Sequence, residues 1–174
     1  MIVVISASLN SDSNSRLLAR EAKRVLEQEG QEVLLLDLRD HPLPLCDGGA
    51  AYRHPNVGHI AAQVRAADAI LIATPIYNYH STAVVKNLIE LTGRAWENKV
   101  VGFLCAAGGM GSYMSIMALA NSLMLDFRTI IVPRFVYATG EAFVEGRIDN
   151  VDVTNRVAEL ARMSARLGQA VKAA

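Results

Sequence analysis

A polar segment near the start of the chain carries side chains that can bind an anion. Residues 6–15 read Ser-Ala-Ser-Leu-Asn-Ser-Asp-Ser-Asn-Ser and follow a short apolar run. Their hydroxyl and amide groups, together with the amino end of a helix, would bind a phosphate monoester. Because the segment has neither glycine nor lysine, it differs from the GxGxxG loop and the Walker A loop. The alternative is that Ser13 or Ser15 only caps the helix.

A second candidate segment runs from Thr74 to Ser81 and contains two tyrosines, an asparagine and a histidine. Pro75 stiffens its start. Tyrosine rings can flank a flat ring system, and backbone amides can hydrogen-bond the nitrogens and carbonyl oxygens of such a system. The alternatives are a polar surface turn and aromatic side chains at a subunit contact.

A third segment, residues 106–112, contains three glycines. Glycine allows the backbone to approach a planar ligand closely. The alternative is a tight turn between a strand and a helix. Each segment is weak evidence by itself, so the prediction of a binding site depends on whether the fold brings the three together.

The elements that would position these segments alternate along the chain. Short β-branched runs are typical of buried strands, and the longer patterns between them are typical of helices. The predicted strands cover residues 2–5, 33–36, 69–73 and 100–104, and a fifth begins at 129–132. The predicted helices cover residues 15–29, 57–67, 82–93, 112–126 and 151–171, and a long loop covers 37–56.

This order predicts a single flavodoxin-like α/β domain over residues 1–174. Its three layers would contain a doubly wound, five-stranded parallel sheet with strand order 2-1-3-4-5. In such sheets ligands bind beyond the carboxyl ends of the strands, where the strand order reverses. The three candidate segments follow strands one, three and four, so we expect them at that edge.

Composition and charge narrow the classes of partner. The chain has 174 residues, with 17 basic and 17 acidic side chains and a formal net charge of zero. This balance gives no support for binding nucleic acid or a membrane surface. We expect no membrane span, because no apolar stretch approaches ~20 residues. The apolar run at the start breaks at Ser6, which is not typical of a signal peptide.

The metal-binding residue types show no ligand spacing. Cys46 and Cys105 fit no metal or redox motif, and the four histidines and the carboxylates near them show no ligand spacing in the sequence. We therefore expect no metal site and a cytoplasmic location, where thiols stay reduced.

In the order and spacing of its motifs, nearly the whole chain resembles the NADPH-dependent FMN reductases of the flavodoxin-like superfamily, which also includes quinone, azo and chromate reductases. The resemblance depends on residues 6–15, on Ala-Thr-Pro-Ile-Tyr-Asn at 73–78, on Lys86-Asn87, and on Ala-Ala-Gly-Gly at 106–109. It implies FMN and NADPH as cofactors and names no catalytic acid, base or nucleophile.

The resemblance also implies which residues bind FMN. The first segment would hold the phosphate, the second would line the isoalloxazine ring, and the glycines of the third would lie along the other edge of the flavin. The implied residues are Ser8, Asn10, Ser13, Asn14, Ser15, Pro75, Ile76, Tyr77, Asn78, Tyr79, Gly108, Gly109 and Met110.

The first segment departs from the family pattern. Many members have Gly-Ser-x-Arg where this chain has Ala-Ser-Leu-Asn at residues 7–10. The missing arginine removes a charge-assisted contact, typically worth ~1.5–3 kcal/mol. We therefore expect FMN to bind more weakly or to exchange.

The predicted activity is hydride transfer from NAD(P)H to FMN and then to a small-molecule acceptor, such as a quinone, an azo compound or a metal oxyanion. The alternatives are a flavodoxin-like electron carrier, a class that tends to be strongly acidic, and a non-catalytic FMN-binding regulatory protein. We expect a homodimer or homotetramer, because the helix around Met114, Met117 and Leu119 has more apolar surface than one sheet face needs. Core packing of Met117 and Leu119 is the alternative.

Overall fold

Three neighbouring strands form the centre of a parallel sheet. In the computed structural model, which describes residues 1–173, β1 (Ile2–Ser6) pairs with β2 (Val33–Asp37) and with β3 (Ala69–Tyr77). On its other side β3 pairs with β5 (Val100–Ala107). All of β1, and all of β3 except Tyr77, is buried. Such continuous burial is expected for strands that helices cover on both faces.

The edge beside β5 is occupied by two short strands instead of one. β6 (Ile130–Ile131) pairs with the start of β5, and β7 (Val136–Thr139) pairs with its end. Between them, Pro133 has no amide hydrogen to donate, and Arg134 has a left-handed φ of 58°. The predicted strand order 2-1-3-4-5 is confirmed as β2-β1-β3-β5-β7, with the fifth position interrupted.

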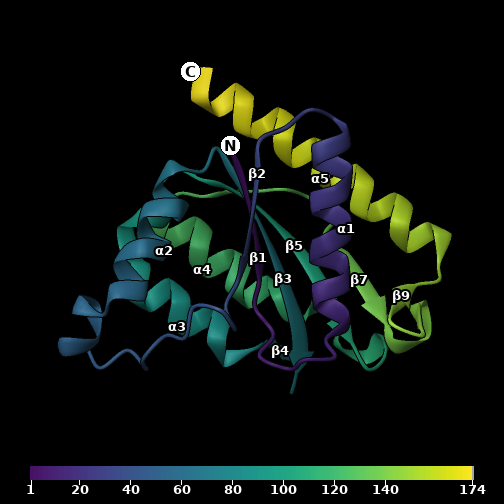
Figure 1. Cartoon of the computed structure of the whole chain (residues 1–174), viewed down its shortest axis with the longest axis horizontal. Coiled ribbons are helices and arrows are strands. Elements are labelled where there is room, and N and C mark those ends of the chain that lie inside the picture. Colours follow the sequence, from purple (N-terminus) through teal and green to yellow (C-terminus); the bar gives the residue numbers. More distant parts are fainter. Residues whose placement is uncertain (174) are drawn as a thin grey trace.

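Helices form the outer layers (Figure 1). α1 (Asn14–Gln28) and α5 (Val151–Ala173) contact each other and cover one face of the sheet. α2 (Pro55–Ala66), α3 (Ala83–Thr92) and α4 (Met117–Phe127) cover the other face. Successive strand residues point to opposite faces, so Ile2 and Val4 pack with α1 and α5, whereas Val3 and Ile5 pack on the other side.

The connections contain short elements that periodicity does not predict. These are the 3₁₀ helices η1 (Ala50–Arg53), η2 (Gly93–Trp96), η3 (Met110–Ile116) and η4 (Gly140–Ala142), and the short strands β4 (His80–Ser81), β8 (Phe143–Val144) and β9 (Arg147–Ile148).

The predicted start of the fourth helix at residue 112 is wrong. α4 begins at Met117, and η3 occupies the preceding residues, with Ser112 outside the helical region at φ −108°. Glycines favour other conformations over a helix, and Gly109 and Gly111 stand directly before this point. None of the helices within residues 1–173 is long and apolar enough to cross a membrane.

Candidate functional site

A cavity of about 220 Å³ lies at the carboxyl ends of β1, β3 and β5. The loops that follow these strands, which we call loop 1 (residues 7–13), loop 2 (78–79, with the flanking end of β3) and loop 3 (108–109), all border it. Its lining residues are Ser8, Asn10, Asp12, Ser13, Asn14, Ser15, Pro75, Ile76, Tyr77, Ala106, Ala107, Gly108 and Gly140. The fold therefore brings the three predicted segments to one cavity.

Two serine hydroxyls line this cavity at the amino end of α1. Ser13 occupies the N-cap position of α1, but its side chain accepts no capping hydrogen bond from the helix. Instead the Ser13 and Ser15 hydroxyls hydrogen-bond each other at 2.8 Å, and both side chains are buried. The alternative of a plain side-chain cap is therefore wrong. Ser13, Asn14 and Ser15 all line the cavity, so the amino end of α1, which is the positive end of the helix dipole, borders it.

Arg16 lies behind loop 1 and was not among the residues predicted to shape the site. Its guanidinium is buried and donates from Nη1 to the carbonyl oxygens of Asn10 and Ser11, at 2.8 and 2.9 Å. Nη2 donates to the Ser8 carbonyl at 3.0 Å, and Nε pairs with Asp37 Oδ2 at 2.6 Å. No sequence pattern links these residues, because Asp37 comes close only when β2 pairs with β1.

Loop 2 is a tight hairpin between β3 and β4. Tyr77 pairs with His80, so the turn has only two residues, Asn78 and Tyr79. Their φ angles of 51° and 62° are both left-handed, as in a type I′ turn. A tyrosine rarely adopts this conformation. The hairpin places Tyr77 against the cavity and carries Asn78 and Tyr79 past its lining residues.

Two buried threonines join loop 1 to loop 2. The Thr82 amide donates to Thr74 Oγ1 at 3.3 Å, and the Thr82 hydroxyl donates to the Ala7 carbonyl at 3.4 Å. The Ala7 amide in turn donates to the Ala73 carbonyl at 2.9 Å. These contacts fix the two loops relative to each other before any ligand binds.

Loop 3 presents backbone to the cavity. A Cβ atom added to Gly108 would meet no atom within 4 Å, so open space lies beside this residue. Tyr137, in β7, donates its hydroxyl to the Gly109 carbonyl at 2.7 Å and so restrains the loop. Partial burial raises the pKa of Tyr137, so the hydroxyl keeps its proton for this bond.

Most of the predicted residues line the cavity, but some do not. Asn78, Tyr79, Gly109 and Met110 lie outside its lining. Conversely, the lining includes four residues that were not predicted to bind FMN: Asp12, Ala106, Ala107 and Gly140. Gly140 follows β7, and it comes to the cavity only because the fifth strand resumes after its interruption.

A family model shows which family of proteins the chain belongs to. The model described as NADPH-dependent FMN reductase matches residues 1–143. The chain belongs to this family. Members are oxidoreductases that use FMN and NAD(P)H, which confirms the predicted cofactors.

Individual relatives agree with the family assignment. This FMN reductase family member is 32% identical over 145 residues to an NAD(P)H-dependent FAD/FMN reductase of Geobacillus thermodenitrificans, a match covering 81% of this chain and 77% of the relative. It is 32% identical to an NAD(P)H-dependent FMN reductase of Pseudomonas aeruginosa, over 84% of this chain and 83% of the relative. A probable NADPH:quinone oxidoreductase 2 of Oryza sativa is 31% identical, over 76% and 68%.

Solved structures confirm the flavodoxin-like fold. FerB, a flavoenzyme NAD(P)H:(acceptor) oxidoreductase from Paracoccus denitrificans, superposes with a TM-score of 0.78 at 20% identity, over 97% of this chain and 96% of FerB. A flavodoxin, WrbA-like protein from Agrobacterium tumefaciens gives a TM-score of 0.63 at 17% identity, over 95% and 96%. At these identities the likeness concerns the fold alone.

The residues of the cavity fit FMN chemically. Buried hydroxyls and helix amides suit a phosphate, and the backbone beside Gly108 leaves room for a flat ring. The polar and the backbone-lined parts belong to one cavity, as a ligand with a phosphate at one end and a ring system at the other requires.

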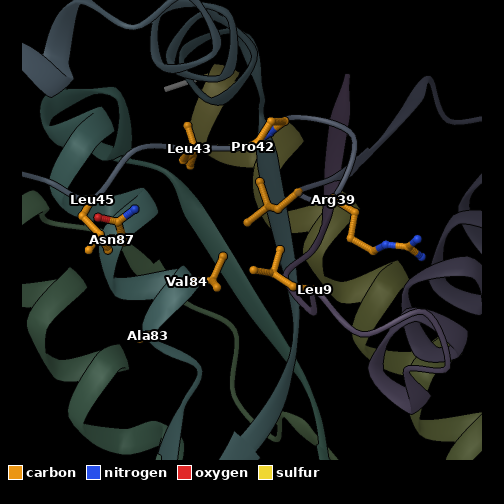
Figure 2. Close-up of a pocket in the computed structure, with 9 residues that line it drawn as sticks. Leu9, Arg39, Pro42, Leu43, Leu45, Ala83, Val84 and Asn87 are labelled. Carbon is orange, nitrogen blue, oxygen red and sulfur yellow. The ribbon is translucent and has the colours of Figure 1, made fainter.

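An apolar cavity of about 250 Å³ lies next to loop 1 and contains none of the predicted FMN-binding residues (Figure 2). Leu9 points into it, and the Arg39 side chain extends away from it. Asn87 holds one wall, because its Oδ1 accepts from the Cys46 amide at 2.8 Å and its Nδ2 donates to the Pro44 carbonyl at 2.9 Å. Asn87 of the Lys-Asn motif therefore orders the long loop after β2.

Proposed function

We propose that residues 1–174 form a single FMN-binding domain that reduces flavin with NAD(P)H and holds FMN in the cavity between loops 1, 2 and 3. One observation carries this proposal. The buried, mutually hydrogen-bonded hydroxyls of Ser13 and Ser15 border the same cavity as the open backbone at Gly108.

Different residues of the chain would bind the phosphate and the ring system of FMN. Ser8, Asn10, Ser13, Asn14 and Ser15 would bind the phosphate through hydroxyls, amides and the amino end of α1. Residues at the end of β3 and in the loop after β5 would line the ring system on its two sides. These residues are Pro75, Ile76, Tyr77, Asn78, Tyr79, Gly108, Gly109 and Met110.

FMN, when bound, supplies the hydride and electron chemistry of the reaction. The protein's contribution is orientation, because the loops are fixed to one another by Thr82 and to the sheet by Tyr137. The lining residue Ala106 and Thr74, which precedes the lining residue Pro75, are both buried, so this wall of the cavity is closely packed. These roles require no side-chain acid, base or nucleophile.

The acceptor class is a second part of the proposal. Relatives named quinone oxidoreductases in Oryza sativa and Solanum tuberosum favour a quinone as an acceptor besides free FMN. Azo compounds and metal oxyanions are further candidates. A panel of these acceptors at fixed NADPH, with turnover measured for each, identifies the preferred class.

The test is NADPH and NADH oxidation by the purified protein, with and without added FMN. We expect oxidation that depends on FMN and that exceeds the rate of NADPH with FMN alone. A protein that binds FMN but oxidises neither nucleotide would be an electron carrier or a regulatory protein instead. A protein that neither binds FMN nor oxidises NADPH would contradict the proposal entirely.

We also propose that two or four copies of the chain assemble around this edge. Leu119 is buried, which agrees with the alternative that it packs in the core. Met114 and Met117 are exposed, at 51% and 42%. Tyr77, Tyr79 and Met110 are more than half exposed. Tyrosine and methionine are enriched at protein interfaces. Light scattering after gel filtration tests this, and a monomer at all concentrations would contradict it.

A cytoplasmic location is part of the same proposal. Cys46 and Cys105 are both free thiols, which suits a reducing compartment. Fractionation of the native cells tests the location, and recovery of the protein outside the cytoplasm would contradict it.

A further inference from the structure

We propose that Arg16 is a positioning residue that sets the backbone of loop 1 for the FMN phosphate and so makes the protein prefer FMN to riboflavin. The inference rests on the proposed function, because it assigns the phosphate to loop 1. It concerns a residue outside the cavity lining.

Unlike most arginines, Arg16 is buried, and each nitrogen of its guanidinium donates a hydrogen bond. Its side chain is only 5% exposed, and it makes four hydrogen bonds, to the carbonyls of Ser8, Asn10 and Ser11 and to the Asp37 carboxylate. A buried guanidinium is costly unless its donors are satisfied. The three carbonyls therefore keep their direction as long as Arg16 is present.

The direction of these carbonyls fixes the direction of the amides that follow. In a trans peptide the N–H points opposite to the preceding C=O. The carbonyls of Ser8 and Asn10 point toward Arg16, so the amides of Leu9 and Ser11 point away from it. In the part of the chain that the structure describes, neither amide donates a hydrogen bond. Both remain available for an anion.

Loop 1 separates Arg16 from the candidate phosphate position. Arg16 and Asp37 line a polar cavity of about 550 Å³ on the far side of the loop. Asp12, Ser13 and Asn14 line both this cavity and the candidate FMN cavity, so the loop is the wall between them. Ser8 and Asn10, whose carbonyls Arg16 holds, line the candidate FMN cavity, so Arg16 fixes the backbone of two residues of that lining.

Arg16 acts through geometry more than through its charge. The Asp37 carboxylate, 2.6 Å from Nε, offsets the charge of the guanidinium. The chain also lacks the arginine that many family members carry at residue 10, and here the Asn10 backbone is held by Arg16 instead. An ammonium group cannot bridge three carbonyls and a carboxylate in this way.

The experiment compares the dissociation constants of FMN and riboflavin, which differ only by the phosphate, in wild type, Arg16→Met and Arg16→Lys. Loss of the fixed backbone at Ser8 and Asn10, beside a charged phosphate, should raise the FMN dissociation constant about tenfold or more in both variants. The riboflavin constant should stay within about twofold. Circular dichroism and thermal unfolding confirm that each variant is folded.

Arg20→Met is the matched control, because it removes the same charge one turn along α1 from an exposed position. It should change neither constant appreciably. If it weakens FMN as Arg16→Met does, or if Arg16→Lys retains full FMN affinity, charge alone explains the effect and the inference fails. Equal losses of FMN and riboflavin would also overturn it, since they indicate a general structural role.

Asp37→Ala keeps the inference testable if neither Arg16 variant folds. This variant leaves Arg16 in place but removes the carboxylate that holds its Nε. FMN should therefore bind more weakly, whereas riboflavin binding should not change. Unchanged FMN affinity in this variant would then overturn the inference. A wild type that binds no FMN would instead contradict the proposed function.

Discussion

At the scale of single residues, several side chains shape the site by holding the backbone of a neighbouring loop. Arg16 holds loop 1, Tyr137 holds loop 3, Thr82 joins loop 1 to the end of β3, and Asn87 holds the loop after β2. The contacts of Tyr137, Thr82 and Asn87 join residues that are distant in sequence. Arg16 lies near loop 1 in sequence, but its partner Asp37 comes from β2. The sequence could therefore indicate the hydroxyls and glycines of the loops but not the residues that support them.

The two cysteines give a prediction at this scale. Cys105 is fully buried in β5, and burial raises the pKa of its thiol far above the ordinary value. Because the thiolate is the reactive form, Cys105 should stay unreactive in the native protein even at pH 9. Cys46 is only partly buried. We expect one thiol per chain to react with a disulfide reagent in native protein and two after unfolding.

The variants Cys46→Ser and Cys105→Ser identify the reacting thiol. The native reaction should disappear in Cys46→Ser and persist in Cys105→Ser. Rapid reaction of both thiols in native wild type would show that β5 is more accessible than the structure describes.

At the scale of elements, α5 crosses the sheet very closely. A Cβ added to Gly168 would lie 2.9 Å from the Asp68 carbonyl oxygen and 3.0 Å from Ala69 Cβ. Gly102 in β5 faces the same helix, and its added Cβ would lie 3.1 Å from Ser164 Oγ. Small residues at both positions therefore set the distance between α5 and the sheet.

This contact reverses the effect expected from helix propensity. Alanine in place of a helical glycine ordinarily stabilises by about 1 kcal/mol. We expect Gly168→Ala to lower the free energy of unfolding by about 1–3 kcal/mol, because the Asp68 backbone cannot move aside easily. Gly58→Ala in α2, where no atom lies within 4 Å of the added Cβ, should raise it by about 0.5–1 kcal/mol. Urea unfolding measures both, and stabilisation by both would contradict the close crossing.

Elements were predictable where local pattern and tertiary packing agree. The continuous apolar runs of β1, β3 and β5 indicate buried strands, and the polar and apolar faces of α1 indicate a surface helix. The fifth strand and α4 were less predictable. Pro133 and Arg134 interrupt the strand, and η3 replaces the first turn that the apolar pattern before Met117 indicated.

At the scale of the whole molecule, the strand order accounts for the position of the site. The chain leaves β1 for β2 on one side and then crosses back to β3 on the other, so loops 1 and 2 diverge at the carboxyl edge. Loop 3 follows β5, the next strand, and closes the space from its far side. The doubly wound topology creates the cavity, and the loop residues determine its chemistry.

The central claim, that FMN occupies the cavity between the three loops, is tested most directly by filling that cavity without disturbing the fold. Neither Gly108 nor Gly111 has a positive φ, and an added Cβ at either meets nothing within 4 Å, but only Gly108 lines the cavity. The measurement is the FMN dissociation constant of Gly108→Val and Gly111→Val. We predict that Gly108→Val weakens FMN binding about tenfold or more, while Gly111→Val stays within about threefold of wild type. Wild-type affinity in a folded Gly108→Val protein would contradict the claim.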